Sequence, residues 1–207
     1  MALEARDIVY RYPCGRRTLR YPGVRVEPGE RVALVAPSGA GKTTLCRLLA
    51  GYLVPTAGRV LVDGEPLARV GALREGASPV QLLLQHPEEA FDPRMRMGAS
   101  LAEARVAPGV DVVALRRAFG VRDEWLARLP HELSGGELMR FAMVRALSCG
   151  PRYLIADEST AMLDAVTQAE LWGVLLDLQE RDGWGMVLVS HSPALLARVA
   201  TRQIALA

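Results

Sequence analysis

The chain has 207 residues, half of them hydrophobic, and a formal net charge of +2. This length and composition suit one sizeable α/β core with an inserted helical lobe, and the small charge excludes the basic stripe of a nucleic-acid-binding protein. No apolar run reaches about 18 residues, the length that a membrane-spanning helix needs, and the first residues lack the apolar region of a signal peptide. The cysteines Cys14, Cys46 and Cys149 form no CxxC pair and no cluster with histidine. This spacing favours reduced thiols over a disulfide framework or a metal site.

The opening segment, up to about Glu30, has short alternating runs interrupted by turn signals at Pro22-Gly23 and Pro28-Gly29. This pattern predicts a small antiparallel sheet. An apolar run at 31–36 then predicts a strand that ends at a glycine-rich turn, and apolar residues at helical spacing predict a helix over 42–53.

The rest of the chain alternates strand and helix signals around one long helical stretch. From about residue 88 to 148 the strand signals vanish, so this stretch is predicted to be a helical insertion within a single domain that spans 1–207. Two later runs, YLIAD and MVLVS, are apolar and end in polar residues, as buried parallel strands do when chemistry occurs at their carboxyl ends. These two runs are predicted strands at 153–157 and 186–190. The remaining predicted elements are strands at 59–63, 80–85 and 202–207, and helices at 165–181 and 194–200.

Residues 36–44, with the sequence APSGAGKTT, follow a predicted strand and open a predicted helix. This is the context of a phosphate-binding loop (P-loop), in which glycines let backbone N–H groups face the phosphates and the helix N-terminus adds partial positive charge. Lys42 is the only lysine of the chain and would reach the terminal phosphates, while the Thr43 hydroxyl would bind Mg²⁺. The usual first glycine is Ala36 here, which is tolerable only if φ is negative at that position. The residues expected to contact the nucleotide are Pro37, Ser38, Gly39, Ala40, Gly41, Lys42, Thr43 and Thr44.

The strand predicted at 153–157 delivers two acids, Asp157 and Glu158, at its end. Phosphoryl transfer needs both a metal clamp and a positioned nucleophile. Asp157 would hold the Mg²⁺ shell through water, and Glu158 would polarise the attacking water as general base. A strand that ends in two acids can also be ordinary surface, but the phosphate-binding loop upstream favours the catalytic interpretation.

Residues 133–137 read LSGGE and lie upstream of the acidic strand. Ser134, Gly135 and Gly136 are predicted at a helix N-terminus, a position that favours anions. With this motif the sequence resembles the ATP-binding cassette family, whose signature motif is LSGGQ. The resemblance covers nearly the whole chain. It implies the α/β fold of a P-loop NTPase, with a mostly parallel central sheet, an N-terminal antiparallel β subdomain and an inserted α-helical subdomain.

Further landmarks of the family follow in order along the chain. Gln85 stands where the family has its Q-loop glutamine, near the metal, and His191 where the family has a switch histidine that hydrogen-bonds the γ-phosphate. Residues 159–164 resemble the D-loop, with Ser159 in place of the usual proline. The resemblance therefore implies that Glu158, His191 and Gln85 are catalytic and that Thr43, Gln85 and Asp157 bind the metal.

An aromatic residue upstream of the P-loop stacks on adenine in this family. Tyr12 occupies that position and Tyr10 is a weaker competitor, although either could be a packing residue. Residues 85–87, 91–94 and 163–172 resemble the peptide and nickel importer branch. They imply that ATP hydrolysis powers import of a peptide or a metal-ion type of solute. Members of that branch normally continue beyond 202–207, so a tail that aids dimerisation or regulation is expected to be missing.

The partners expected for this chain also come from the resemblance. In the family the signature motif contacts the γ-phosphate held by the P-loop of a second subunit. This implies ATP and Mg²⁺ as cofactors and a head-to-tail dimer with a second cassette, identical or different. It further implies transmembrane permease subunits, through which alone the chain would meet the membrane, at the cytoplasmic face of the inner membrane. No nucleic-acid partner is expected.

Two other interpretations remain open. Soluble cassettes that never meet a transporter, such as relatives in translation or DNA repair, usually fuse two cassettes or carry long coiled-coil insertions. This chain has one cassette and no heptad run. A weakly active regulatory cassette of a heterodimer is the second alternative, because Ala36, Ser159 and Glu137 depart from the family pattern.

Overall fold

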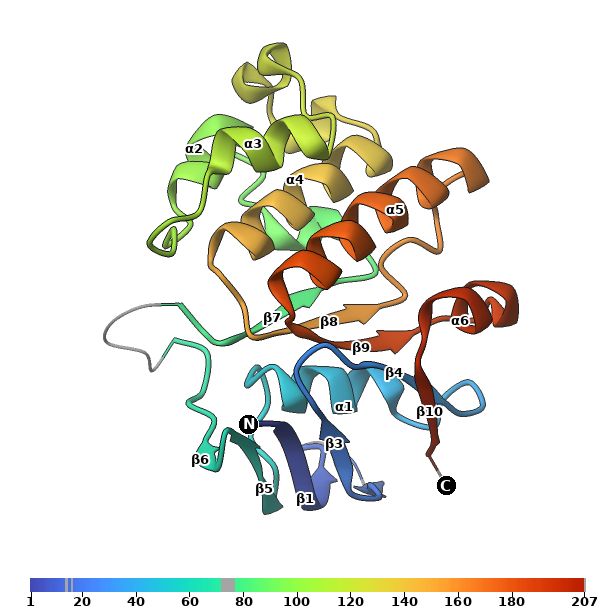
Figure 1. Cartoon of the computed structure of the whole chain (residues 1–207). Helices are drawn as coiled ribbons and strands as arrows, with labels where there is room; N and C mark the ends of the chain where they lie inside the picture. The colour runs from blue at the N-terminus through green and yellow to red at the C-terminus, as the bar shows by residue number, and fades with distance from the viewer. Residues whose placement is uncertain (14, 16, 72–76, 207) are drawn as a thin grey trace.

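The structure, a computed structural model, describes residues 1–13, 15, 17–71 and 77–206. Cys14 and the last residue of the strand predicted at 202–207 lie outside these described residues, while Cys46 and Cys149 are free thiols. Two β-sheets lie on either side of one helix, α1, and a layer of longer helices covers the far side of the second sheet (Figure 1). None of the described helices is long and apolar enough to span a lipid bilayer.

The first sheet is antiparallel and is built around β1 (Leu3–Arg11). β1 pairs with β2 (Thr18–Arg20), β3 (Val24–Val26) and β5 (Ala57–Val62), and β5 pairs with β6 (Glu65–Pro66). The predicted N-terminal antiparallel sheet is therefore confirmed. The sheet also contains β5 and β6, which follow the helix after the P-loop in the sequence.

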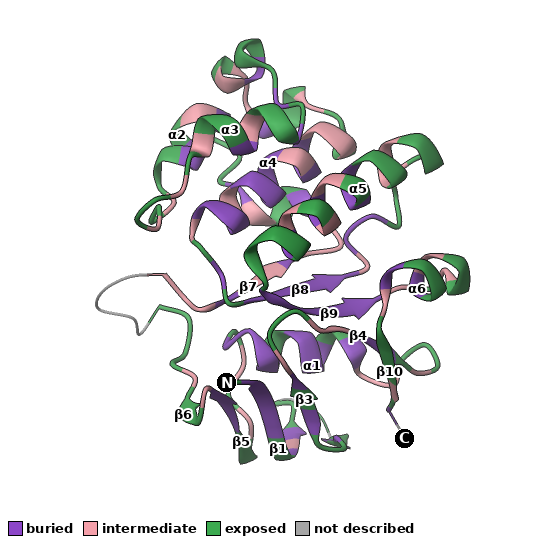
Figure 2. Cartoon of the chain, viewed as in Figure 1, coloured by how far each residue is buried: buried purple, intermediate pink, exposed green. Residues whose placement is uncertain are grey.

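The second sheet is parallel throughout, with the order β10-β4-β9-β8-β7. This arrangement confirms the mostly parallel central sheet expected from the sequence. β8 and β9 are buried along their whole length, because helices cover both faces of the sheet (Figure 2). All five carboxyl ends meet at one edge of the sheet, which is where the acidic residues lie. The strands are β4 (Arg31–Val35), β7 (Val80–Leu83), β8 (Tyr153–Asp157), β9 (Gly185–Val189) and β10 (Arg202–Ala205).

Two apolar cores flank the parallel sheet. One surrounds α1 (Lys42–Leu49), whose Leu45 and Leu48 pack among residues of both sheets. The other lies between the sheet and the helices α4 (Gly135–Ser148) and α5 (Ala165–Asp182). These cores clamp the parallel sheet from both sides and leave its carboxyl edge for the polar residues.

Helices alone connect β7 to β8. α4 is the longest of them. The others are short, because Gly and Pro residues leave only a few apolar residues between them in this stretch. This confirms that a helical subdomain is inserted in the α/β core. The short helices are η1 (Pro87–Ala90), α2 (Met97–Ala102), α3 (Val112–Ala118), η2 (Asp123–Ala127) and η3 (Pro130–Glu132), and α6 (Pro193–Val199) follows later in the chain.

Two predicted boundaries are wrong for reasons that involve glycine. The helix expected to reach residue 53 ends at Leu49, because the left-handed conformation of Gly51, with φ +76°, ends it. Glycine is needed there, since a Cβ would lie 2.8 Å from the carbonyl oxygen of Ala68. The strand expected at 59–63 ends at Val62, because Asp63 and Gly64, with φ of 55° and 88°, turn the chain into β6. The strand expected at 80–85 likewise stops early, at Leu83.

Candidate functional site

The loop between β4 and α1 turns through two glycines in a left-handed conformation. Gly39 has φ 76° and Gly41 has φ 94°, a region that residues with a Cβ rarely adopt. At Gly41 a Cβ would also lie 2.7 Å from the Tyr21 hydroxyl oxygen. Ala36, in place of the first glycine of the motif, is not among the residues with positive φ. Alanine therefore fits that position without backbone strain, as the sequence required.

Lys42, the first residue of α1, curls back over this loop. Its side chain is almost buried, with 7% exposed. Its Nζ donates hydrogen bonds to the carbonyl oxygens of Ala36 at 3.0 Å and Pro37 at 3.2 Å. The ammonium group is thus held at the loop by neutral carbonyl partners, which a phosphate group entering the loop could replace.

Tyr12 lies next to the same loop, just after β1. Its hydroxyl is hydrogen-bonded to the Thr44 hydroxyl, and its ring packs edge-on against Tyr10 with centroids 5.1 Å apart. Tyr12 is 40% exposed, whereas Tyr10 is 8% exposed. Of the two tyrosines, Tyr12 is therefore the one that a base could reach from solvent.

Asp157 ends β8 and pairs with Val189 of β9. It is buried, and its Oδ1 atom has no hydrogen-bond partner among the described residues. Burial raises the pKa of Asp157, a hydrogen bond with Thr43 opposes this shift, and the charge of Glu158 adds to it. Mg²⁺ prefers oxygen ligands and usually takes only one or two from the protein beside water and phosphate oxygens. A buried carboxylate oxygen without a partner, beside a threonine hydroxyl, fits that requirement.

Glu158 follows directly and adopts an unusual backbone conformation, with φ 50°. For a residue with a side chain this costs about 1 kcal/mol, and such strain clusters at functional sites. Its Oε1 lies 2.9 Å from Nε2 of His191, and its backbone N–H donates to the carbonyl oxygen of Val189. His191 is exposed and Glu158 is mostly buried. A carboxylate oriented by an imidazole at the sheet edge is well arranged to accept a proton from water.

Gln85 lies past the end of β7 in the bend that leads to η1, and it is half-buried. The pairing of Leu83 with Ala156 places it near the carboxyl end of β8, the strand that carries the acids. The segment after it is tied to the helical subdomain, because the Arg145 side chain of α4 donates a 2.5 Å hydrogen bond to the carbonyl oxygen of Ala90. Gln85 thus stands between the acidic edge and the inserted helices.

The LSGGE motif begins α4. The Ser134 hydroxyl accepts the backbone N–H of Glu137 at 3.3 Å, and the Glu137 carboxylate accepts the backbone N–H of Ser134 at 2.7 Å. This reciprocal pair is a capping box, so the glutamate that replaces the usual glutamine stabilises the helix start. The motif opens onto a cavity of about 500 Å³ that none of the residues 36–44 lines. The cavity is lined by Gly120, Arg122, Trp125, Ser134, Gly135, Gly136, Glu137, Arg140, Met162, Leu163, Asp164 and Thr167.

The segment between Glu158 and α5 is anchored by its own side chains. The Thr160 hydroxyl accepts hydrogen bonds from Nε1 of Trp172 and Nε2 of Gln168, both at 3.0 Å. Asp164 caps α5 by accepting two backbone N–H groups of its first turn. Ser159, at the position of the usual proline, is buried with its hydroxyl oxygen unpartnered among the described residues. These contacts fix the D-loop segment against α5.

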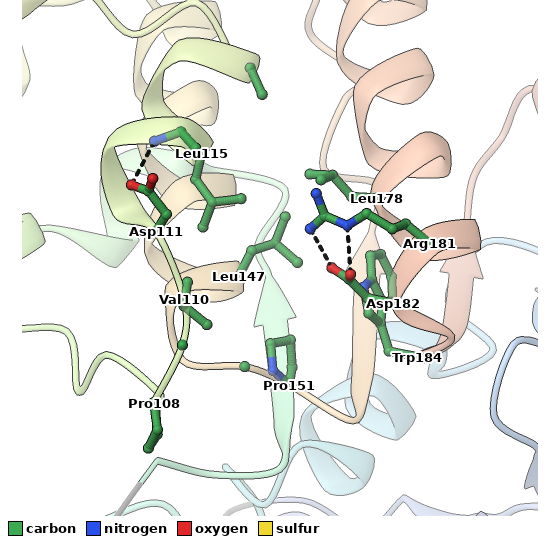
Figure 3. A pocket seen from close by; sticks show the side chains of 14 residues that line it. Pro108, Val110, Asp111, Leu115, Leu147, Pro151, Leu178, Arg181, Asp182 and Trp184 are labelled. Carbon is green, nitrogen blue, oxygen red and sulfur yellow. Dashed lines mark hydrogen bonds and ion pairs between the residues drawn. The ribbon is translucent and has the colours of Figure 1, made fainter.

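A larger cavity, of about 730 Å³, lies away from all of these residues. In Figure 3, Val110, Leu115 and Leu147 line one side of it and Leu178 and Trp184 the other. The Arg181–Asp182 ion pair lies at its edge. No predicted site residue lines this cavity, so the chemistry of the side chains and not cavity size marks the candidate site.

The structure gathers most of the predicted residues at one place and sets the signature residues at another. The first group, joined by the contacts above, is Tyr12, Gly39, Gly41, Lys42, Thr43, Thr44, Asp157, Glu158 and His191. Ser134, Gly135 and Gly136 lie apart from this group, at the cavity of about 500 Å³. Sequence reasoning missed Tyr21, whose hydroxyl donates to the carbonyl oxygen of Gly41 at 2.9 Å. No local pattern could have revealed this contact, because it depends on how the first sheet packs against the loop.

Comparison with known proteins agrees with this geometry. The family described as ABC transporter matches residues 19–161. A peptide import ATP-binding protein of Brucella abortus is 34% identical over 210 residues, 95% of this chain and 63% of that protein. The di/tripeptide transport ATP-binding protein DppF of Pseudomonas aeruginosa is 33% identical over 217 residues, 96% of this chain and 67% of that protein. A solved dimeric ATP-binding cassette, in a post-hydrolysis state with ADP and Pi, has a TM-score of 0.80 at 23% identity and covers 99% of this chain and 94% of its own.

These matches bear on different parts of the conclusion. The solved cassette is too distant in sequence to show more than the fold. The chain spans only 63% of the length of the Brucella relative. The family match, in contrast, covers most of the chain and includes the P-loop, the LSGGE motif and both acids. The chain therefore belongs to the ABC transporter family.

Proposed function

We propose that this chain is the ATP-binding and ATP-hydrolysing subunit of an ABC importer, which powers uptake of a small solute through partner permease subunits. The observation that carries the proposal is the grouping of Lys42, Asp157 and the Glu158–His191 pair at the carboxyl edge of one parallel sheet. Relatives at about one-third identity that are named for peptide import or di/tripeptide transport favour a peptide over a metal-ion type of solute.

Nucleotide binding is assigned to the P-loop and Tyr12. The backbone N–H groups of residues 37–41 and the N-terminus of α1 would face the phosphates, with the Lys42 ammonium group beside them. Thr44 would contact the phosphates from the first turn of the helix, and Tyr12 would stack on the adenine. The side-chain contact between Tyr12 and Thr44 joins the base end of this site to its phosphate end.

Mg²⁺ would be held by Thr43 and Asp157, with Gln85 close to the same edge. The observation that supports this assignment is the Oδ1 atom of Asp157, which has no hydrogen-bond partner within the residues that the structure describes. When bound, Mg²⁺ neutralises the charge of the β- and γ-phosphate oxygens. Asp157 contributes by presenting its carboxylate from a rigid, fully buried strand.

Hydrolysis is assigned to Glu158 and His191. The Glu158 carboxylate would take a proton from the attacking water, and the 2.9 Å contact with His191 would hold that carboxylate in place. His191, which is exposed, would also hydrogen-bond the γ-phosphate. Gln85, between this edge and the helical subdomain, would report the state of the site to the inserted helices.

The cavity of about 500 Å³ at the LSGGE motif supports a dimer as the working form. Ser134, Gly135 and Gly136 open onto a cavity that the P-loop of the same chain does not line, so a phosphate there would come from a second cassette. The first turn of α4 offers the N–H groups for such an anion. The permease partners would then hold the cassettes at the cytoplasmic face of the inner membrane.

A weakly active regulatory cassette is the alternative that specific residues favour. Ser159 leaves a buried hydroxyl oxygen with no hydrogen-bond partner in the described part of the chain, and Glu137 places a carboxylate next to the proposed anion site. Ala36 does not favour it, since alanine fits there without positive φ. A soluble cassette without permeases would instead co-purify with ribosomes or DNA and with no membrane subunit.

Steady-state ATP hydrolysis tests the proposal. Glu158→Gln keeps the shape of the side chain and removes the base, so kcat is expected to fall by roughly 10²- to 10⁴-fold while ATP still binds. Glu65→Gln, on β6, is the matched control and should hydrolyse ATP like the parent. Equal turnover by Glu158→Gln and the parent would show that Glu158 is not the base. A parent that binds ATP without turnover would favour the regulatory alternative.

A further inference from the structure

Tyr21 makes a contact with the P-loop that the proposed function does not use. It follows β2, is 7% exposed, and donates its hydroxyl to the carbonyl oxygen of Gly41 at 2.9 Å. The same carbonyl oxygen accepts the N–H of Leu45 at 3.0 Å, the first helical bond of α1. Tyr21 therefore adds a second, non-helical bond to the peptide that joins the loop to the helix.

The shape of this contact is as specific as its hydrogen bond. A Cβ at Gly41 would lie 2.7 Å from the Tyr21 oxygen and 2.9 Å from Cδ1 of Leu19. Both side chains come from the antiparallel sheet, and together they fill the space against the glycine. The left-handed turn at Gly41 is thus confined from outside the loop, directly before Lys42.

The chemistry of Tyr21 suits a permanent donor. Burial raises its pKa to about 12, and a hydrogen bond with Thr44 partly opposes that shift. The hydroxyl therefore stays protonated at neutral pH. Thr44 is also bonded to Tyr12, so the hydroxyls of Tyr12, Thr44 and Tyr21 meet at the start of α1.

We propose that Tyr21 is a positioning residue for the P-loop: its hydroxyl holds the peptide of Gly41 so that the loop N–H groups and Lys42 are oriented for phosphate before ATP arrives. A loop that is ordered in advance loses less conformational freedom on binding, which raises affinity without a new contact to the ligand. This inference rests on the proposed function, because ATP is the ligand whose affinity it improves.

Tyr21→Phe tests the inference with little risk to folding, since the Gly41 carbonyl keeps its bond from Leu45 and the ring stays in place. The substitution removes the hydrogen bonds of the Tyr21 hydroxyl with the Gly41 carbonyl oxygen and with Thr44, so KM for ATP should rise by about threefold to tenfold, with kcat within about twofold of the parent. Tyr153→Phe is the matched control. Tyr153 is also buried, with a pKa raised to about 12, but it begins β8, four residues before Asp157, and its hydroxyl has no hydrogen-bond partner among the described residues.

Leu19→Ala separates packing from hydrogen bonding, because it removes the apolar contact with Gly41 and keeps the Tyr21 hydroxyl. A smaller rise in KM than in Tyr21→Phe is expected. An unchanged KM in Tyr21→Phe, or an equal rise in Leu19→Ala, would overturn the proposal. So would a fall in kcat with KM unchanged, which a merely structural role would give.

Amide hydrogen exchange of the nucleotide-free protein distinguishes this proposal from the proposed function. The backbone amides of residues 38–44 should exchange about threefold to tenfold faster in Tyr21→Phe than in the parent. They should be unchanged in Tyr153→Phe. If Tyr21→Phe exchanges faster than the parent and the parent hydrolyses no ATP, the positioning role would be supported and the proposed function contradicted. Equal exchange in Tyr21→Phe and the parent would overturn the positioning role, whatever the activity.

Discussion

Gly39 and Gly41 have the same left-handed backbone conformation but different surroundings. A Cβ at Gly39 would meet no heavy atom within 4 Å, whereas a Cβ at Gly41 would meet Tyr21 and Leu19. The sequence motif treats both glycines alike, as parts of a phosphate-binding loop. In the structure, Gly39 is required only for its positive φ, whereas Gly41 is also required because a side chain has no room there.

This difference predicts unequal effects of alanine at the two positions. Gly39→Ala should lower the free energy of unfolding by about 1 kcal/mol, the strain of a left-handed residue with a Cβ. Gly41→Ala should cost at least about 1 kcal/mol more, because Tyr21 and Leu19 must also move. Urea unfolding of both variants measures the difference. Equal losses would show that the contact with Tyr21 is not tight.

Single residues differ in how well the sequence reveals them. Lys42, Asp157 and Glu158 each occupy a fixed place in a motif at a strand end, so their roles could be predicted from local sequence. The contact between Glu158 and His191 then follows from parallel strands that end at one edge. Tyr21 belongs to no motif, and its bond to Gly41 joins residues 20 positions apart. Contacts of this kind depend on tertiary packing, so the sequence could not predict Tyr21.

At the scale of elements, β10 shows how a short edge strand is held. Arg202 forms an ion pair with Glu30, with Nε 2.7 Å from Oε1, and donates a 2.6 Å hydrogen bond to the carbonyl oxygen of Arg25. The hydrogen bond from Arg202 lowers the pKa of Glu30, against the smaller opposing effect of burial. β10 is therefore fastened to the turn before β4 by charge as well as by its strand pairing.

Glu30→Gln should therefore destabilise the protein in a pH-dependent way. The folded pKa of Glu30 lies below its unfolded value, so the stabilisation is present above the unfolded pKa and is lost as pH falls through the folded pKa. The pair is partly exposed, so the loss at pH 7 should be at most about 1 kcal/mol. It should shrink as pH falls below about 4.3. Urea unfolding across this range measures it, with Glu65→Gln as control, and a loss that stays constant with pH would contradict the assignment.

Element types followed from hydrophobic periodicity, while several boundaries did not. YLIAD is a strand from Tyr153 to Asp157, as predicted, because both of its faces are buried. The helix after the P-loop ends at Leu49, and the glycine that ends it, Gly51, was a signal that the longer prediction overlooked. The Asp-Gly pair after β5 is an equally clear hairpin signal. Apolar spacing alone therefore extends an element past the turn residues that end it.

At the scale of the whole molecule, the sequence indicated two sheets and an inserted helical subdomain but not the strand pairing between distant segments. β5 pairs with β1, and Leu3 lies opposite Val62, although the P-loop and α1 separate the two strands in the sequence. Such pairing depends on which sheet has a free edge, and periodicity carries no information about it. The same long-range packing brings the antiparallel sheet against the P-loop.

The whole-molecule claim is that one chain supplies only half of each ATP site. In the proposed dimer the P-loop and the acids would form one half, because the signature residues open onto a separate cavity. If two chains pair head to tail, each LSGGE motif faces the P-loop of the other chain. ATP then becomes part of the interface, so dimerisation and nucleotide binding are thermodynamically linked.

ATP-dependent dimerisation of the Glu158→Gln variant tests this claim most directly, because the variant should bind ATP without hydrolysing it. Sedimentation velocity with saturating ATP, with ADP and with no nucleotide would measure the oligomeric state. We expect a dimer with ATP and a monomer in the other two conditions. A variant that binds ATP, remains monomeric and shows the same sedimentation in all three conditions would contradict the account.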